Sequence, residues 1–377
     1  MISARRGHTA HEKEVTILKE FMAPTRIISG TGAVRALLDL GSKRLMVVSD
    51  PFFAENGTAQ ALAQLSGASE TMIYRDVKPD PTVEQAALGA DALRRFQPDT
   101  LVALGGGSAM DLAKAMAYFG GEKVCLVAIP TTSGSGSEVT NFAVLTHQGT
   151  KYPLVDAALC PDVAILDDEL LRKMPPSLVA DAGFDVLAHA MEAMVAGRAG
   201  AVTDVLAKAA FATVLDQLEE SYRGNLSVRL PIHQASTMAA MAFTRAGLGL
   251  CHALSHSLGG QFHVPHGRLN AILLPVVMEC NLPVAQKKYA ALARAAGLGG
   301  SADTVAVRNL KNSLLRLRKN IQLPATLAQA GIQPAALLAA REKIVAATLA
   351  DECCKDNPVP VDAGMVRNVL QAVMGGG

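Results

Sequence analysis

This 377-residue chain has little aromatic character, little charge and no large excess of either sign. It contains no tryptophan, aromatic residues make up 4% and charged residues 18%. Lysine and arginine number 35 against 34 acidic residues, and this near-zero balance lacks the basic excess of a general nucleic-acid-binding protein. Hydrophobic residues reach 50%, enough to offset the entropy of ordering, so disorder is excluded as the main state.

Cysteines and long apolar runs are also scarce. The six cysteines include no C-x-x-C pair, which argues against a disulfide scaffold or a zinc ribbon. The longest apolar runs, near Ala271–Met278 and Val124–Pro130, fall short of the ~20 residues that span a bilayer. Charged residues precede any apolar stretch at the N-terminus, unlike in a signal peptide. We therefore expect a cytoplasmic protein with reduced thiols and no nucleic-acid or membrane partner.

The two halves of the chain differ in hydrophobic pattern. Strands are predicted over Arg44–Ser49, Thr71–Arg75, Thr100–Leu104 and Cys125–Ile129, with helices over Val83–Phe96 and Ala109–Tyr118. These apolar runs are continuous, as in strands buried on both faces, which predicts a parallel sheet covered by helices. From Leu178 to Leu370 the spacing is helical. We predict an α/β domain over residues 1–172 and an all-helical domain over residues 173–377.

Glycine-rich turns follow two of the predicted strands. Gly105-Gly106-Gly107-Ser108 lies between a strand and a helix, where backbone N–H groups can face a phosphate. The segment Pro130–Glu138 is predicted to repeat the strand, turn and helix order, so the pair of turns suits a dinucleotide. The alternative is an ordinary helix start, because Ser135 and Glu138 fit a capping box.

An acidic residue favours one dinucleotide over the other. Asp50 ends the strand Arg44–Ser49, where a carboxylate can bind a ribose diol and repel a 2′-phosphate, which favours NAD over NADP. The alternative is that Asp50 only caps the turn before Pro51. Gly30-Thr31-Gly32 resembles part of the Rossmann fingerprint, but position 35 is arginine and the preceding strand is poorly defined, so we reject it.

Histidines cluster in the second half of the chain. Asp185 and His189 stand four residues apart and share a helix face, as do His252 and His256. Two more histidines, His263 and His266, complete a 15-residue window. One carboxylate with several imidazoles suits Fe²⁺ or Zn²⁺ better than Mg²⁺ or Ca²⁺. Spacing alone leaves open which of the four clustered histidines are ligands.

Four motifs in this order resemble the iron-containing, group III alcohol dehydrogenases across nearly the whole chain. They are Gly105-Gly106-Gly107-Ser108-x-x-Asp111-x-x-Lys114, the run Pro130–Thr140, Gly183-x-Asp185-x-x-x-His189-Ala190-x-Glu192, and the segment from Gly247-Leu248-Gly249 to His266-Gly267. The resemblance implies a dehydroquinate synthase-like architecture, with an active site between an α/β dinucleotide-binding domain and a helical domain. It also implies a metal-dependent oxidoreductase that interconverts short aliphatic aldehydes and primary alcohols with NAD(H).

The same resemblance assigns roles to individual residues. It implies metal ligands at Asp185, His189, His252 and His266, and a proton-relaying His256 without metal. The implied cofactor-binding residues are Asp50, Gly105, Gly106, Gly107, Ser108, Asp111, Thr131, Thr132 and Lys151. Phe142, Phe243 and Cys353 match positions that face the substrate in relatives, and favour an apolar alcohol over a sugar.

Within the family, the chain looks closest to the 1-propanol dehydrogenase branch associated with bacterial microcompartments. That likeness implies a homo-oligomer with shell or core proteins as partners. Arg245 and Arg268 depart from the residues usual in relatives. The alternatives are a zinc-dependent glycerol or diol dehydrogenase, a lactaldehyde reductase, a dehydroquinate-synthase-like lyase and a silent NAD-binding structural protein. Val15, Leu18 and Met22 have the spacing of a short targeting helix, although a frayed terminus is the plainer interpretation.

Overall fold

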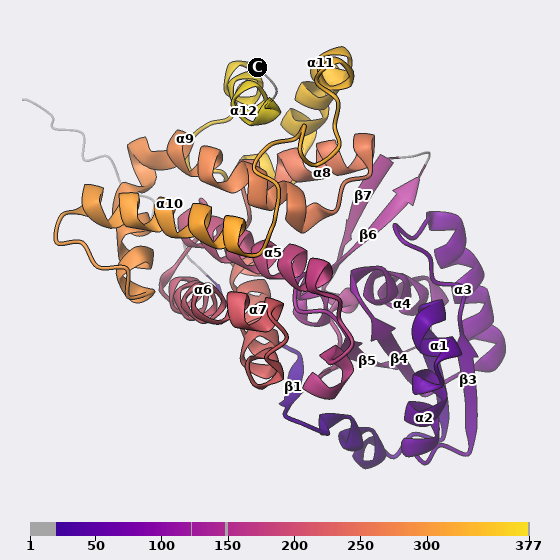
Figure 1. Ribbon diagram of the computed structural model, residues 1–377. Coiled ribbons are helices and arrows are strands. Elements are labelled where there is room, and N and C mark those ends of the chain that lie inside the picture. Colours follow the sequence, from indigo (N-terminus) through magenta and orange to yellow (C-terminus); the bar gives the residue numbers. More distant parts are fainter. Residues whose placement is uncertain (1–19, 122, 148–149, 376–377) are drawn as a thin grey trace, which may run out of the picture.

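The computed structural model describes residues 20–121, 123–147 and 150–375 and contains an α/β part and a helical part (Figure 1). Most of the segment suggested for targeting lies outside these residues. The six strands of the main sheet are β1 (Arg26–Ser29), β2 (Arg44–Ser49), β3 (Glu70–Tyr74), β4 (Thr100–Gly105), β5 (Cys125–Pro130) and β8 (Val163–Leu166). Their order is β1-β8-β5-β4-β2-β3, and every neighbouring pair is parallel. The predicted parallel sheet is confirmed.

Helices cover both faces of this sheet. They are α1 (Pro51–Glu55), α2 (Thr58–Leu65), α3 (Val83–Phe96) and α4 (Gly107–Gly120). Alternate residues of one strand serve the two faces: Leu101 and Ala103 of β4 pack with α3 and α4, whereas Val102 and Leu104 pack with α2 and the 3₁₀ helix Ala33–Leu40. Burial on both faces explains why the strands read as continuous apolar runs.

An antiparallel hairpin leaves the sheet before the helical part. It consists of β6 (Phe142–His147) and β7 (Thr150–Val155), which pair along their whole length. Figure 1 shows the hairpin rising from the α/β part toward α8. The sequence pattern missed this hairpin, as well as β1 and β8.

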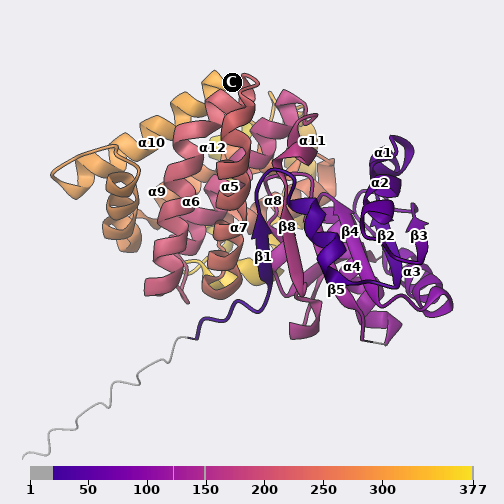
Figure 2. The same cartoon turned by 90° about the horizontal axis from the view of Figure 1, so that it is seen from below.

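The rest of the described chain is helical, as predicted. Its helices are α5 (Pro176–Val195), α6 (Ala201–Tyr222), α7 (Arg229–Ala246), α8 (Leu250–Phe262), α9 (His266–Ala295), α10 (Asp303–Asn320), α11 (Pro334–Ala350) and α12 (Ala363–Met374). Helix α5 is buried along nearly its whole length, with α6, α7 and α9 against it (Figure 2). It forms the axis of the largest hydrophobic core.

Helix α9 is long and apolar enough to cross a membrane by length and composition alone. Its apolar side chains, among them Leu269, Ile272 and Leu273, instead belong to the core shared with α5. Gly267 in its first turn lies so close to α5 that an added Cβ would stand 1.9 Å from the carbonyl oxygen of Asp181. The helix therefore belongs to the protein core.

Candidate active site

The order in which the chain adds strands to the sheet reverses at a point that also carries the first glycine-rich turn. From β2 the chain moves outward to β3 and then returns to β4 on the other side of β2. In open parallel sheets, ligands bind at the carboxyl ends of the strands flanking such a switch. Asp50 follows β2 and Gly106 follows β4 at that edge, where Ser49 and Leu104 are paired. The two predicted nucleotide contacts are thus brought together.

The glycines of this turn are required by close packing. Gly105 has a φ of 152°, and a Cβ there would stand 2.6 Å from Ala109 Cβ and 3.3 Å from Asp50 Oδ2. Helix α4 begins at Gly107, two residues earlier than predicted, so Ser108 lies in its first turn. The first N–H groups of a helix lack carbonyl acceptors one turn earlier in the chain, so such a helix start is suited to an anion.

Asp50 caps a helix, and its contact with a ribose stays a prediction. Its Oδ1 accepts a hydrogen bond from Phe53 N at 3.1 Å and so caps α1. Its Oδ2 lies beside Gly105, at the edge where the first glycine-rich turn begins. Capping and ribose binding are therefore compatible, because each uses a different oxygen.

The second turn does not open an α-helix, and that prediction is wrong. Only a 3₁₀ turn, Ser137–Val139, follows the glycines, and the expected capping box between Ser135 and Glu138 is absent. Glu138 is buried instead and accepts a hydrogen bond from Thr237 Oγ1 at 2.6 Å. The side chain of Glu138 fixes the loop to α7, which local sequence spacing could not reveal.

The loop Pro130–Thr140 contacts both the α/β part and the helical part of the molecule. Thr131 N donates to the Gly105 carbonyl at 3.0 Å, and Thr132 Oγ1 lies 3.4 Å from where a Cβ of Gly106 would be. On its other side, a Cβ on Gly134 would stand 3.1 Å from Ala182 Cβ of α5. Gly134 of this loop therefore lies against α5 within one helical turn of Asp185.

A buried lysine of α4, Lys114, stabilises this loop through hydrogen bonds. Lys114 of α4 donates to the Ser137 hydroxyl, to the hydroxyl and carbonyl oxygens of Thr140, and to the Phe142 carbonyl, at 2.8–3.1 Å. Burial lowers the pKa of Lys114 to about 8. Asp111, a predicted cofactor residue, accepts from Ser137 Oγ at 2.9 Å. Its observed role is to position the loop, and a direct contact with a nucleotide stays a prediction.

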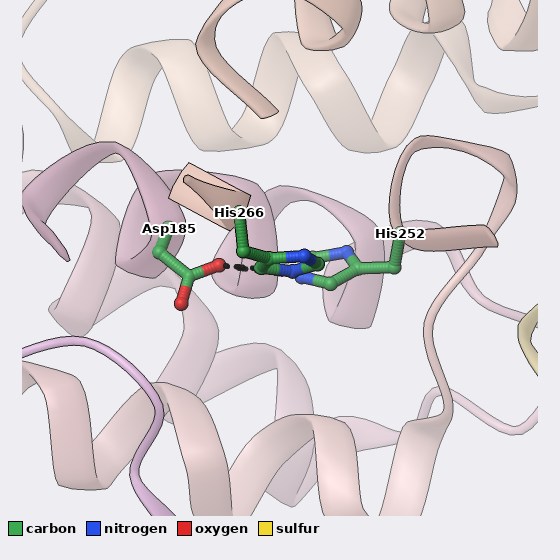
Figure 3. Close-up of side chains that lie close together, drawn as sticks. All are labelled: Asp185, His252 and His266. Carbon is green, nitrogen blue, oxygen red and sulfur yellow. Dashed lines mark ion pairs between the residues drawn. The ribbon is translucent and has the colours of Figure 1, made fainter. Parts of the chain in front are cut away.

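Three imidazoles converge on one carboxylate oxygen in the helical part. The Nε2 atoms of His189, His252 and His266 lie 3.7, 3.7 and 3.5 Å from Asp185 Oδ1. Figure 3 shows Asp185, His252 and His266 facing one another from α5, α8 and the start of α9. The four residues that the family resemblance implied as ligands are therefore brought together. His263 is the exposed residue that ends α8, and it takes no part in this cluster.

The charges at this centre favour a bound cation. Burial opposes ionisation of Asp185, yet the surrounding histidines, with a hydrogen bond from His252 among the causes, hold its pKa below the usual range. Burial lowers the pKa of His189 to about 3, so its ring is neutral and available as a ligand. Hydrogen bonds to Asp185 and Glu192 overcome burial and raise the pKa of His252 to about 9. Without a metal, His252 therefore keeps an extra proton at the place where these four residues would hold a metal ion.

Two further residues orient the ligands. Glu192 accepts from His252 Nδ1 at 2.6 Å and from the N–H groups of Gly249 and Cys251 at 2.9 and 2.7 Å. Asn270 Nδ2 donates to Asp185 Oδ1 at 2.8 Å. Such partners fix the tautomer and direction of metal ligands. Glu192 stands three residues after His189 on the same face of α5, and helical spacing was the signal that could have found it.

His256 is held by a carboxylate distant in sequence. Its Nδ1 lies 2.9 Å from Asp351 Oδ2, and its ring stacks on His266 with centroids 5.1 Å apart. The hydrogen bond lowers the pKa of Asp351 to about 2, against the effect of burial. Asp351 lies 95 positions from His256 in a turn after α11, and no sequence pattern connected the two.

The predicted substrate residues also gather here. Phe243 stacks on His189 with ring centroids 4.4 Å apart, and Phe142 lies 6.2 Å from Phe243. Cys353 belongs to a cluster with His256 and Asp351. Lys151 is farther out, ion-paired with Asp80 at 2.6 Å on the hairpin surface. Phe142 and Phe243 therefore form an aromatic wall beside His189, and both the substrate contact of this wall and the nucleotide contact of Lys151 stay predictions.

The two unusual arginines have local partners. Arg268 forms a bidentate ion pair with Asp181 at 2.9 and 3.1 Å, which fixes the start of α9 to α5. Arg245 donates to the Met22 carbonyl at 3.0 Å. Both arginines therefore attach neighbouring segments to one another.

Comparison with known proteins identifies the family. The sequence model of iron-containing alcohol dehydrogenases matches residues 24–168, and that of the C-terminal part of the same family matches residues 179–374. The chain belongs to the iron-containing alcohol dehydrogenase family. It is 39% identical over 372 residues to the 1-propanol dehydrogenase PduQ of Salmonella typhimurium, covering 95% of this chain and all of that protein. This iron-containing alcohol dehydrogenase is an oxidoreductase that interconverts alcohols and aldehydes.

Other relatives support the same assignment. The NADPH-dependent butanol dehydrogenase of Clostridium saccharobutylicum is 36% identical over 380 residues, covering 94% of this chain and 98% of that one. The iron-containing alcohol dehydrogenase of Thermococcus thioreducens superposes with a TM-score of 0.86 at 32% identity, covering 94% and 99%. A 1,3-propanediol oxidoreductase gives 0.89 at 28% identity, covering 95% and 100%. The predicted family and fold are confirmed.

Proposed function

We propose that this alcohol dehydrogenase interconverts propionaldehyde and 1-propanol, using NADH and Fe²⁺, with Zn²⁺ as the alternative metal. The observation that carries the proposal is the convergence of three imidazole Nε2 atoms on Asp185 Oδ1, beside the aromatic wall of Phe142 and Phe243. A short aliphatic group suits that wall, which offers no hydroxyl-binding side chain. The likeness to 1-propanol and butanol dehydrogenases supports the same substrate class.

The donor set fits a divalent transition metal, and Asp185, His189, His252 and His266 would hold it. When bound, that metal supplies Lewis-acid catalysis, while the nicotinamide supplies the hydride chemistry. Glu192 keeps Nε2 of His252 directed at the site by accepting from Nδ1. Phe243 packs over His189 and excludes water from that side.

His256 moves the proton in this proposal. Because Nδ1–H donates to Asp351, Nε2 has a free lone pair. Nε2 takes the hydroxyl proton during alcohol oxidation and returns it during aldehyde reduction. Asp50, the glycines after β4, Ser108, Thr131, Thr132 and Lys151 are assigned to the nucleotide.

The decisive experiment is reduction of propionaldehyde by NADH on protein stripped with a chelator and then supplied anaerobically with Fe²⁺ or Zn²⁺. Activity restored by one metal would support the metal site, the reaction and the metal's identity together. Glycerol and lactaldehyde serve as comparison substrates. Faster turnover of either than of propionaldehyde would contradict the aliphatic substrate.

Replacing Asp351 with asparagine tests the proton pathway. Asparagine preserves the cap on the following turn but removes the charge that orients His256, so kcat is expected to fall about tenfold with little change in KM. Asp362→Asn is the matched control, since Asp362 caps α12 in the same way. Steady-state kinetics on both variants decides the matter, and an equal loss in the control would contradict the role of Asp351.

Replacing Asp50 with serine tests cofactor choice. Serine still caps α1 but no longer repels a 2′-phosphate, so the ratio of kcat/KM for NADPH to that for NADH should rise about tenfold, or 1.4 kcal/mol. Asp39→Ser on the nearby 3₁₀ helix controls for loss of charge alone. If this ratio of kcat/KM values does not change, Asp50 caps α1 but does not select between NADH and NADPH.

The proposal extends to organisation and location. We place the division between the two domains at residues 172 and 173, between β8 and α5. Likeness to PduQ proteins favours a homo-oligomer encapsulated in a bacterial microcompartment, with shell or core proteins as partners. Co-sedimentation of the tagged chain with purified microcompartments tests this location, and recovery only in the soluble fraction would oppose it.

A further inference from the structure

A second cluster of metal-binding side chains lies beside the first. Ligand atoms of His256, Asp351 and Cys353 all lie within 4.8 Å of one another. Asp351 connects the cluster, because Oδ2 faces His256 Nδ1 at 2.9 Å and Oδ1 accepts from Cys353 N at 2.9 Å. The three residues come from α8 and the adjoining turn Glu352–Asp356, with Asp351 immediately before that turn.

The chemistry of this cluster differs from that of the first. The Asp185 centre offers one carboxylate and three imidazoles, and no sulfur. The second cluster adds a thiol, and thiolate ligands favour Zn²⁺ and similar thiophilic cations. His256 has 38% of its side chain exposed, so a cation and its water ligand can reach the cluster from solvent.

We propose that His256, Asp351 and Cys353 form a second, weaker site for a thiophilic divalent cation such as Zn²⁺, and that filling it inhibits the enzyme. The inhibitory part rests on the proposed function, because it assigns proton transfer to His256. Three protein ligands and one water complete a tetrahedral zinc site.

Binding requires one proton to leave and one to change place. The Cys353 thiol gives its proton to solvent and becomes a thiolate. Through exchange with solvent, His256 loses the proton on Nδ1 and gains one on Nε2, so that Nδ1 binds the cation in place of its hydrogen bond to Asp351. No group is oxidised or reduced. Burial raises the pKa of Cys353 well above its usual range, so displacement of its proton costs affinity and makes this site the weaker one.

Inhibition follows from the tautomer of the ring. A neutral imidazole carries one N–H, so a cation on Nδ1 places the remaining proton on Nε2. Nε2 then has no lone pair with which to accept the hydroxyl proton. Occupation of the second site therefore blocks the proton acceptance that alcohol oxidation requires, without displacing the metal at Asp185.

The adjacent cysteine provides a matched control. Cys354 Sγ donates to the Thr348 carbonyl at 3.0 Å, and Cys354 is absent from the cluster. Cys353→Ser removes the sulfur ligand, whereas Cys354→Ser changes a neighbouring thiol of the same turn. The two variants differ only in whether the proposed site loses a ligand.

The first test is spectroscopic and independent of turnover. Co²⁺ is added to enzyme already loaded with one equivalent of Fe²⁺ under anaerobic conditions, and thiolate-to-cobalt absorption is followed in the near ultraviolet. We expect the band in the wild type and in Cys354→Ser, and its loss in Cys353→Ser. Because the first centre has no sulfur, cobalt there gives no such band. Absence of the band in the wild type, or its persistence in Cys353→Ser, would overturn the site.

The second test measures inhibition. Adding Zn²⁺ to iron-loaded enzyme should lower oxidation of 1-propanol by NAD⁺ about tenfold in the wild type and in Cys354→Ser. Cys353→Ser should lose less than about half of its own zinc-free rate. Elemental analysis must show iron retained, since loss of iron with the activity would overturn the inhibitory mechanism. Failure of the proposed function would look different: no aldehyde reduction with any metal, but an intact thiolate–cobalt band.

Discussion

His266→Ala is expected to lower kcat/KM for aldehyde reduction at least ~10³-fold, or about 4 kcal/mol. The substitution removes one of the three imidazoles around Asp185 Oδ1, so metal is lost on dialysis. His266 is the first residue of α9 with 35% of its side chain exposed, so its loss leaves no large buried cavity. NADH binding, followed by fluorescence titration, should be unchanged because the nucleotide residues lie elsewhere.

His263→Asn is the matched control for this loss. His263 ends α8 three residues before His266, exposed and with a φ of 56° that asparagine also adopts readily. Metal content and kcat/KM should stay within about twofold of wild type. Equal losses in both variants would show that the loop between α8 and α9, and not the ligand, controls activity.

Glu192→Gln is expected to weaken metal binding about 10- to 100-fold and to destabilise the fold by about 1–3 kcal/mol. The Glu192 carboxylate accepts three short hydrogen bonds, from Gly249 N, Cys251 N and His252 Nδ1. Glutamine fits the same space but turns an N–H₂ group toward one of these donors. That donor stays buried and unsatisfied, and His252 loses the partner that fixes its tautomer.

Metal retained during dialysis against graded chelator, together with urea unfolding, measures both effects. Glu220→Gln is the control, since the Glu220 side chain pairs with exposed Arg223 just after α6 and should change neither quantity. Metal affinity unchanged in Glu192→Gln would show that Asn270 and the helix packing orient the ligands without Glu192.

The sequence alone identified the elements with strong local signals. The helix Val83–Phe96 was predicted with the observed bounds, and the structure shows a capping box of Thr82 and Gln85 at its start. Strands β2, β4 and β5 were found within one residue because both of their faces are buried. Strand β1 was missed since it is an edge strand with mostly exposed residues. In β6 burial alternates along the strand, but Phe142–Leu145 is a continuous apolar run, so the sequence does not show that alternation.

Local spacing also determined part of the metal site. Asp185 and His189 share one face of α5, and the histidine window supplied the remaining candidates. Local spacing could not identify which of those histidines are ligands, because the bend at His263 between α8 and α9 decides which rings turn inward. The family resemblance supplied that choice, and the structure brings the four implied ligands together.

Tertiary structure alone decided what surrounds those ligands. Asp351 reaches His256 across 95 positions, and Glu138 turned away from the expected helix cap because Thr237 of α7 offers a buried hydrogen-bond donor. Periodicity along the chain reports which side of an element is buried, whereas these contacts depend on how separate elements pack. The residue types and the faces they occupy were therefore fixed by the sequence pattern, and the partners that orient them by the packing of α5, α7, α8 and the turn after α11.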